Sequence, residues 1–200
     1  MGLVLGIDLG TSYSCAAAVL EDRIVVVEDE LGRKTLPSIV HFGTDGKTSV
    51  GYEARERIAL APEDTIHSAK RMLGSRVDDP AVRIAKSAYL YDIVEGPNRW
   101  PLIRAQGGPY AIPVVCAAIL RELRARAETF FGEKISKAVI TVPANSSDSQ
   151  REQTRIAGRI AGLEVLDLLN EPTAAALAYS LLHSSRRIIA VYDFGGGTFD

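Results

Sequence analysis

Two segments at opposite ends of the chain each place an aspartate at the end of an apolar run, with a glycine-containing turn directly after it. Asp8 precedes Leu9-Gly10-Thr11, and Asp193 precedes Phe194-Gly195-Gly196-Gly197-Thr198. Such a turn points several backbone N–H groups to one side, and a nest of this kind binds phosphate. A carboxylate beside a phosphate requires a cation between them, and Mg²⁺ takes that place through one or two carboxylates and water. The two segments together predict a phosphate and magnesium site.

Each half of this site also has a simpler interpretation. An aspartate often caps its own turn, and Leu9-Gly10-Thr11 alone is typical of a hairpin. The three consecutive glycines after Asp193 are harder to explain in this way, because glycine weakens the end of a strand. Two aspartates in matching positions favour the metal, and a repeated turn is what two similar halves of a duplicated fold would show.

Two further charged residues are candidates with ordinary alternatives. Glu171 begins a predicted helix after Asn170, where the free N–H groups and the positive end of the helix dipole lie. The alanines at 174–176 allow close approach of a neighbour or ligand, but an acidic residue at this position is also a common cap. Lys70, in Ala69-Lys70-Arg71, is by its surroundings an ordinary exposed lysine on a helix.

The elements that position these residues alternate in type along the chain. Apolar runs predict strands, the first of them buried on both faces, and amphipathic periodicity predicts helices. Asp45-Gly46 predicts a hairpin turn, and Ser149-Gln150-Arg151-Glu152 has the pattern of a capping box. Strands alternating with helices predict an α/β fold with helices packed on a sheet. The predicted strands cover residues 3–7, 15–20, 23–28, 37–42, 89–94, 101–105, 138–142, 164–169 and 188–192, and the predicted helices cover 53–61, 65–73, 117–131, 149–162 and the residues after 170.

Composition and charge exclude several classes of protein. The 200 residues are 46% apolar and 24% charged, which is the balance of a globular protein. A net charge of −2 argues against non-specific nucleic-acid binding and against an anionic membrane surface. The chain has two cysteines, Cys15 and Cys116, both in apolar stretches where buried, inert thiols are expected. With no predicted membrane span or leader, we expect a soluble cytoplasmic protein that binds neither nucleic acid nor membrane.

Seven motifs occur in a fixed order over essentially all 200 residues. Through them the sequence resembles the seventy-kilodalton heat-shock chaperones of the DnaK type, and specifically the first half of their ATPase domain. The motifs are Gly6-Ile7-Asp8-Leu9-Gly10-Thr11-Ser12-Tyr13-Ser14, Leu36-Pro37-Ser38, Ala69-Lys70-Arg71, Val142-Pro143-Ala144, Asp148-Ser149-Gln150-Arg151, Asn170-Glu171-Pro172-Thr173-Ala174-Ala175-Ala176, and Asp193-Phe194-Gly195-Gly196-Gly197-Thr198-Phe199-Asp200.

The resemblance implies a role for each matched residue in binding and hydrolysing ATP. Lys70 matches the lysine that positions the γ-phosphate and the attacking water. The reaction implied is transfer of the γ-phosphoryl group to water, which requires positioning and charge neutralisation and no covalent nucleophile. The implied catalytic residues are Lys70, Glu171, Asp193, Thr198 and Asp8, and the implied nucleotide-binding residues are Gly10, Thr11, Ser12, Tyr13, Lys70, Gly195, Gly196, Gly197 and Thr198.

The resemblance also implies metal sites and a relay. Asp8, Glu171 and Asp193 match carboxylates around Mg²⁺ and its waters, and Asp8 and Asp200 match positions associated with bound K⁺. The metal-binding residues are therefore expected to be Asp8, Glu171, Asp193 and Asp200. Pro143 and Arg151 match residues that relay the nucleotide state, ATP or ADP, towards a substrate-binding domain.

The implied architecture is lobe I of an actin-like ATPase domain, with the ribonuclease H-like fold and a small inserted α/β subdomain at roughly residues 36–112. A second lobe is expected to begin at about residue 188 and to be cut off at residue 200. The family resemblance implies three partners besides ATP, namely unfolded client polypeptides bound by a further C-terminal domain, a J-domain co-chaperone and a nucleotide exchange factor. The 200 residues alone are expected to bind MgATP weakly and to hydrolyse it poorly.

The sequence departs from the family pattern at a few positions and leaves alternatives open. After Val142-Pro143-Ala144 the family usually has an aromatic pair, and this chain has Asn145 and Ser146. This puts interdomain signalling in doubt rather than nucleotide binding. Ser12 stands where threonine is usual and keeps the hydroxyl group. Another ATPase of the actin-like superfamily, a sugar kinase, or a nucleotide-sensing module that does not hydrolyse ATP are the alternatives.

Overall fold

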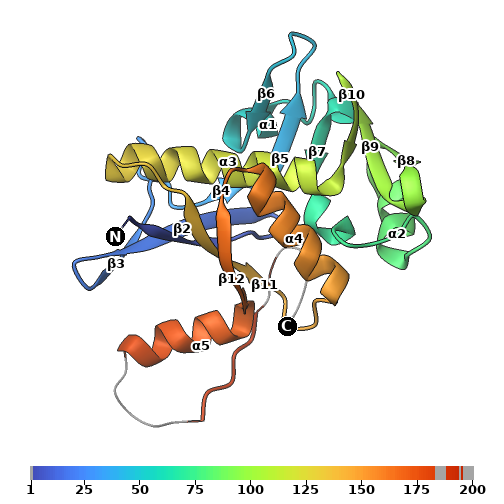
Figure 1. Cartoon of the computed structure of the whole chain (residues 1–200). Coiled ribbons are helices and arrows are strands. Elements are labelled where there is room, and N and C mark those ends of the chain that lie inside the picture. The colour runs from blue at the N-terminus through green and yellow to red at the C-terminus, as the bar shows by residue number, and fades with distance from the viewer. Residues whose placement is uncertain (1, 183–187, 194, 196–200) are drawn as a thin grey trace.

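A six-stranded mixed sheet forms the centre of the computed structural model, which describes residues 2–182, 188–193 and 195 (Figure 1). The main path of the sheet runs β12-β11-β1-β2-β3, and β4 pairs with β2. β1, β11 and β12 are parallel, whereas β2 is antiparallel to β1, β3 and β4. The bounds are β1 Val4–Asp8, β2 Tyr13–Leu20, β3 Arg23–Val26, β4 Leu36–Pro37, β11 Lys137–Val142 and β12 Glu164–Asn170.

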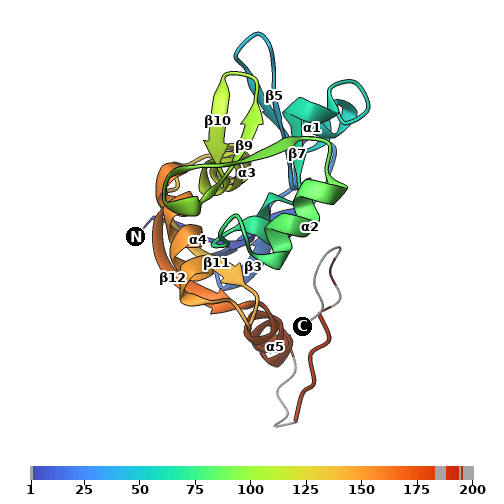
Figure 2. The ribbon, with the colours of Figure 1, turned by 90° about the vertical axis from the view of Figure 1, so that its right-hand side faces the viewer.

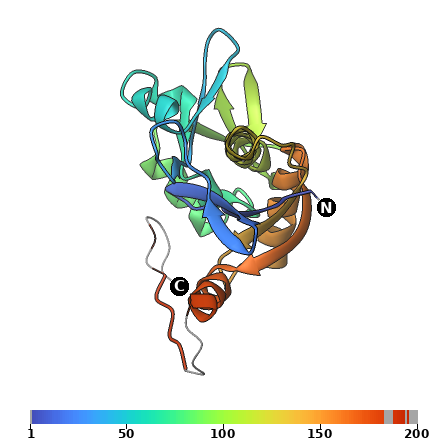
Figure 3. The ribbon, with the colours of Figure 1, turned by 90° about the vertical axis from the view of Figure 1, so that its left-hand side faces the viewer.

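Two long helices cover one face of this sheet, and a third lies on the other side (Figures 1 and 3). α3 (Ile112–Phe131) packs on β2, and α4 (Asp148–Ile160) packs on α3 and β12. α5 (Glu171–Leu182) follows β12 directly and contacts β11 and β12. In β1 only Leu5 and Ile7 are buried, so the prediction of a strand buried on both faces was wrong. The α/β class predicted from the alternation of elements is confirmed.

The residues between β4 and α3 build two small antiparallel sheets, ordered β6-β5-β7 and β10-β9-β8 (Figure 2). The Asp45-Gly46 hairpin between β5 and β6 is confirmed. The bounds are β5 Ile39–Phe42, β6 Thr48–Val50, β7 Thr65–His67, β8 Asp92–Glu95, β9 Pro101–Ala105, β10 Gly108–Ala111, α1 Tyr52–Glu56 and α2 Pro80–Ala88, with 3₁₀ helices at Pro62–Asp64, Ala69–Met72 and Pro97–Arg99.

The predicted helix over residues 65–73 was wrong. Thr65–His67 is strand β7 and pairs with β5, which the β-branched Thr65 and Ile66 favour. Ser68 then adopts a left-handed conformation with φ of 56°, and a 3₁₀ helix at Ala69–Met72 follows. A left-handed residue interrupts a helix. The sharp turn at Ser68 therefore presents Lys70 on a short, tight element rather than on the face of a long helix.

Other element boundaries also differ from the prediction. α3 begins at Ile112, five residues before the predicted start at 117, because Pro113 fits its first turn. The capping box of α4 is formed by Ser147 and Gln150, not by Ser149, and α2 was not predicted. Residues 188–192 form no strand in the structure, and Ile188 is fully exposed. A strand requires a neighbour to pair with, and among the described residues this segment has none.

The two cysteines differ in their burial. Cys116, a residue of α3, is buried in the core, where burial raises the pKa of its thiol to about 12, so the expected burial of this thiol is confirmed. Cys15 is only half-buried. Burial and the nearby negative charge of Asp8 raise the pKa of the Cys15 thiol, which also keeps it protonated.

Candidate functional site

The turn after β1 is fixed by a set of hydrogen bonds that involve two buried serines. The backbone N–H of Gly10 donates to Ser14 Oγ at 3.1 Å, and Ser38 Oγ donates to the Gly10 carbonyl at 2.7 Å. The two hydroxyl oxygens lie 2.9 Å apart, and the Ser38 N–H donates to the Ser12 carbonyl at 2.8 Å. Ser14 and Ser38 are 1% and 4% exposed, so solvent cannot replace these bonds. The turn is therefore held rigidly before any ligand arrives.

Gly10 is required at this turn for reasons of space. A Cβ at residue 10 would lie far inside contact distance of the Tyr13 carbonyl oxygen. The neighbour is backbone and cannot move aside without opening the turn. The ring of Tyr13 is half exposed, and its hydroxyl accepts a long hydrogen bond from Arg55 at 3.5 Å. Of the predicted phosphate-loop residues, Thr11 lines a cavity that also contains Lys70.

Lys70 and Glu171 form an ion pair across the molecule. Lys70 Nζ donates to Glu171 Oε1 at 2.6 Å, although the two residues lie 101 positions apart in the sequence. Their side chains are only 14% and 12% exposed. Lys70 reaches this point from the short 3₁₀ helix after Ser68, and Glu171 does so because β12 ends directly at the start of α5. A largely buried ion pair offsets its loss of hydration only when its geometry is good and its remaining polar atoms find hydrogen-bond partners.

Two more carboxylates act on this pair. Burial raises the pKa of Glu171, and the negative charges of Asp8 and Asp193 raise it further, while Lys70 opposes the shift. Thr141 at the end of β11 donates its hydroxyl to Asp8 Oδ1 at 2.9 Å. The Glu171 carboxylate thus lies near one ammonium group and two further negative charges. This excess of negative charge favours a bound cation.

The cation would be held largely through water. Within the described residues, no three His, Cys, Asp or Glu side chains converge closely enough to coordinate one ion together. Mg²⁺ commonly keeps several waters and binds through one or two carboxylates and phosphate oxygens. The arrangement of Asp8, Glu171 and Asp193 around a turn with no room for a Cβ fits Mg²⁺ together with a phosphate.

The relay residues predicted from the resemblance lie next to this site. Arg151 on α4 donates to Asn170 Oδ1 at 2.6 Å and to the Ser146 carbonyl at 3.4 Å. The Ser146 N–H in turn donates to the carbonyl of Pro143, which lines the same cavity as Lys70. Arg151 therefore joins the loop after β11 to the residue directly before Glu171.

Part of the predicted site lies outside the described residues, namely Gly196, Gly197, Thr198 and Asp200. The second glycine turn and the predicted K⁺ position are therefore not placed. The structure brings together Asp8, Lys70, Glu171 and Asp193. It also adds supporting side chains to which the sequence argument gave no role in the site, namely Ser14, Ser38 and Asn170, which stand in the quoted motifs, and Thr141, which does not. The spacing of these residues in the sequence does not predict their contacts. Each hydrogen bond either joins segments that are distant in the sequence or lies within a common kind of turn.

Removing the Ser38 hydroxyl is expected to loosen the turn. Ser38→Ala leaves the Ser14 O–H without its buried acceptor and the Gly10 carbonyl without its side-chain donor, which costs about 1–2 kcal/mol of unfolding free energy. Urea denaturation measures this loss. Ser87→Ala is the matched control, because the Ser87 hydroxyl bonds to the Ile84 carbonyl on the exposed side of α2 and should cost little. Equal losses in the two variants would contradict the role given to Ser38.

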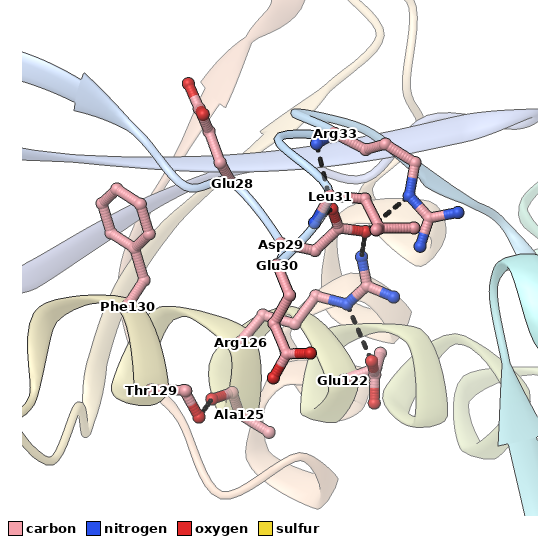
Figure 4. A pocket seen from close by; sticks show the side chains of 10 residues that line it. All are labelled: Glu28, Asp29, Glu30, Leu31, Arg33, Glu122, Ala125, Arg126, Thr129 and Phe130. Carbon is pink, nitrogen blue, oxygen red and sulfur yellow. Dashed lines mark hydrogen bonds and ion pairs between the residues drawn. The ribbon is translucent and has the colours of Figure 1, made fainter.

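Another cavity, of about 690 Å³, lies elsewhere, between residues 28–33 and the second half of α3 (Figure 4). Its wall is an ion-pair network rather than a catalytic group. The Asp29 carboxylate accepts from Arg33 Nε at 2.6 Å and from Arg126 at 3.5 Å, and Arg126 also pairs with Glu122 at 2.8 Å. This cavity shares no lining residue with the one beside Lys70. We interpret its charges as structural.

Asp29 is expected to stabilise the fold in a pH-dependent way. Burial alone would raise its pKa, but hydrogen bonds from Arg33 and Leu31 outweigh this and lower the pKa below the ordinary 3.8. The unfolded chain then binds more protons between the two values, so stability rises with pH there. Asp29→Ala should cost about 2 kcal/mol at pH 7, and the difference should shrink as the pH falls below 3.8.

Chemical denaturation of the wild type and of Asp29→Ala, at pH 7 and at a pH below 3.8, checks this expectation. Glu30→Ala is the control, because Glu30 lines the same cavity and makes no hydrogen bond or ion pair in the part of the chain that the structure describes. A pH-independent cost for Asp29→Ala would show that the carboxylate contributes only through its packing.

Two findings bear on the class of protein. None of the helices in the described ranges is both long enough and apolar enough to cross a membrane. The phosphate turn, the Lys70–Glu171 pair and the adjacent carboxylates come from motifs in the order in which one family carries them. Residues 4–200 match the model of the family described as Hsp70 protein, and the chain therefore belongs to the Hsp70 family.

Proposed function

We propose that this chain binds MgATP at the Asp8, Lys70, Glu171 and Asp193 site and transfers the γ-phosphoryl group to water. Membership of the Hsp70 family implies a chaperone ATPase domain. The observation that carries the proposal for these residues is the Lys70–Glu171 pair at 2.6 Å, held among two further carboxylates beside the Gly10 turn. An ammonium group and several carboxylates around a phosphate turn are the parts that such a transfer requires.

The chain's own residues account for binding and charge neutralisation. The backbone N–H groups after Gly10 bind phosphate oxygens, and the turn does not have to reorganise because Ser14 and Ser38 already hold it. Lys70 neutralises charge on the transferred group and orients the attacking water. Asp8, Glu171 and Asp193 hold the waters of the cation. Mg²⁺, when bound, offsets the negative charge of the phosphates. A phosphate oxygen that replaces Glu171 as the partner of Lys70 leaves Glu171 free to hold the waters of the cation.

The proposal extends to regulation and to the whole protein. The Pro143 loop, Arg151 and Asn170 form a bonded path that ends beside Glu171, and this path is suited to transmit the nucleotide state to a client-binding domain. We place residues 1–200 in lobe I of an actin-like ATPase domain, with K⁺ near Asp8 and Asp200. The protein would act in the cytoplasm with unfolded clients, a J-domain co-chaperone and an exchange factor.

Calorimetric titration of the native gene product with ATP tests the site. Binding is expected to require Mg²⁺ and to weaken at least roughly tenfold in its absence, because the carboxylates then repel the phosphates. Asp8→Asn should reduce this dependence on Mg²⁺, while Asp22→Asn, on the exposed β2–β3 turn, should leave it unchanged. Binding that is indifferent to Mg²⁺ in the wild type would refute the proposal.

Arg151→Ala tests the relay separately. The variant loses the bonds to Asn170 and Ser146 but keeps Lys70, Glu171 and Asp8 in place. We expect ATP binding to persist and the stimulation of hydrolysis by an unfolded peptide to disappear. Arg155→Ala, one turn further along α4, is the control. Peptide stimulation of wild-type strength in Arg151→Ala would remove Arg151 from the proposed path.

A further inference from the structure

A third cavity, which we call the apolar cavity, lies away from the nucleotide site. It has a volume of about 370 Å³ and lies between the loop after Met72, strand β9, the start of α3 and one side of α4. Among the described residues it shares no lining residue with the cavity beside Lys70, and none of those that line it is charged. Since an unpaired charge is costly to bury, this lining suits an uncharged ligand.

The backbone fixes the walls of the apolar cavity. Gly74 has a φ of 75°, and a Cβ at this residue would lie 2.6 Å from the backbone of Gln150 on α4. The Gly74 carbonyl also accepts a hydrogen bond from the Ser149 hydroxyl at 2.8 Å. Three further lining residues are prolines, which lock their own φ angle, namely Pro97, Pro101 and Pro113. These constraints hold the cavity open before a ligand arrives.

The apolar cavity runs from an open rim to a buried floor. Val114 and Ile160 line it and are 36% and 41% exposed, so they form the rim. Met72 and Ile112 also line it and are 0% and 2% exposed, so they form the floor. A ligand that enters past the rim therefore loses most of its contact with water.

A serine hydroxyl near the floor lacks a hydrogen-bond partner. Ser75 lines the apolar cavity and is 8% exposed. Its backbone N–H donates to the Met72 carbonyl at 3.1 Å, but its hydroxyl has no partner among the described residues. No side-chain oxygen of those residues is both sealed from solvent and unpartnered, so this hydroxyl keeps access to the cavity. A ligand that bonds to it would remove the cost of an unmade hydrogen bond.

Trp100 gives the apolar cavity an aromatic wall. The Arg76 guanidinium lies 3.5 Å from the centre of the Trp100 ring and also donates to the Asn98 carbonyl at 2.6 Å. These two contacts hold the ring in place. Arg76 is not among the residues that line the cavity, so its charge stays outside. A ring held in this way packs well against the ring of a ligand.

We propose that the apolar cavity binds a small uncharged ring compound, whose ring packs against Trp100 and Ile112 and whose hydroxyl or carbonyl group bonds to Ser75 Oγ. The volume falls within the range of small-molecule sites, roughly 300–1,000 Å³, and an apolar lining with a few polar groups is typical of them. The flat surface of a protein partner would cover the rim and would not reach Ser75. The proposal does not depend on ATP binding or hydrolysis.

Titration of the full chain, labelled with 5-fluorotryptophan, with 2-naphthol tests the proposal by ¹⁹F NMR. Trp100 is the only tryptophan in the sequence, so one signal reports on the cavity. This signal is expected to shift and to saturate, together with the methyl signals of Ile112 and Val114. The methyls of Ala81 and Ile84, which line the cavity beside Lys70, should not move. No saturable shift at Trp100, or shifts confined to Ala81 and Ile84, would overturn the proposal.

Two further titrations separate this site from its alternatives. Myo-inositol, a ring with a hydroxyl on every carbon, should leave the Trp100 signal unchanged at concentrations at which 2-naphthol saturates it, because it has no apolar edge. Equal shifts with both compounds would contradict an apolar site. Dilution of the chain without ligand should also leave the signal unchanged. A shift that depends on protein concentration would show that a second copy covers the cavity, and the proposal would fail.

Ser75→Ala tests the hydrogen bond to the ligand. Because the Ser75 hydroxyl has no partner among the described residues, the variant is expected to fold normally. It should bind 2-naphthol roughly three- to tenfold more weakly, the loss expected for one hydrogen bond. Ser87→Ala, on the exposed side of α2, is the control and should bind as the wild type does. Wild-type affinity in Ser75→Ala would overturn the proposal, since apolar contact alone would then account for binding.

Two variants at the rim test the location of the ligand. Val114→Phe and Ile160→Phe should each weaken 2-naphthol binding at least roughly tenfold, because the added ring competes with the ligand for space. Both positions are partly exposed, so neither change enlarges a core side chain. Val19→Phe is the control, because Val19 is 61% exposed on β2. Wild-type affinity in the rim variants would overturn the proposal, and if one of them fails to fold the other decides.

Discussion

Replacing Lys70 with alanine is expected to slow ATP hydrolysis by roughly 10²–10³-fold, the loss found when a preorganised group that neutralises transition-state charge is removed. Lys70 is the basic partner that the structure pairs with Glu171, and the negative charges of Asp8 and Asp193 also act on that glutamate. Without it the pKa of Glu171 should rise further, because Lys70 is the group that opposes the shift. Single-turnover hydrolysis by the native gene product measures the rate, and its pH dependence reports the state of Glu171.

Two variants serve as controls for this prediction. Lys47→Ala removes an exposed lysine from the β5–β6 hairpin and should leave hydrolysis unchanged. Lys70→Arg keeps the positive charge but replaces a compact ammonium group with a planar one, so we expect only partial recovery. Hydrolysis at the wild-type rate in Lys70→Ala would mean that the chain uses a different mechanism.

Replacing Gly10 with alanine is expected to abolish measurable MgATP binding and to cost about 2–4 kcal/mol of unfolding free energy, in the range of severe backbone changes. The added Cβ would collide with the Tyr13 carbonyl, so the turn must open and the hydrogen bonds to Ser14 and Ser38 must break. Calorimetric titration with MgATP and urea denaturation measure the two effects.

Gly6→Ala, in the strand that leads into this turn, is the matched control. A Cβ at Gly6 would lie 3.5 Å from the Ala17 carbonyl oxygen, which is ordinary contact, so stability and binding should change little. If Gly10→Ala still bound MgATP with wild-type affinity, the turn after β1 would not be the phosphate-binding element.

The sequence predicted the sheet better than it predicted the segment that carries Lys70. Strands β1, β2, β11 and β12 follow from largely apolar runs, of which that of β11 is closed by Pro143, and the structure confirms them. The region from residue 65 to 73 was predicted as a helix because Thr65 can cap the start of a helix and Gly74 can end one. Pairing of Thr65–His67 with β5 and the left-handed Ser68 override that local preference.

The meeting of Lys70 and Glu171 could be expected only from the family resemblance. Local sequence assigns each an ordinary role, one as an exposed lysine and the other as a cap. Their contact depends on how β12 ends and how the segment at residues 65–73 folds back, and both are properties of the tertiary structure. The supporting bonds of Ser38 and Thr141 are long-range for the same reason.

The most direct test of the central claim is to follow ATP turnover by the native gene product in ¹⁸O-enriched water. Transfer of the γ-phosphoryl group to water predicts one ¹⁸O atom in each phosphate released and none in ADP, with a rate that falls in Lys70→Ala. Phosphate transferred to another acceptor, with no free phosphate formed, would indicate a kinase. Tight binding of MgATP without any turnover would indicate a nucleotide-sensing module. Either result would contradict the ATPase that the site predicts.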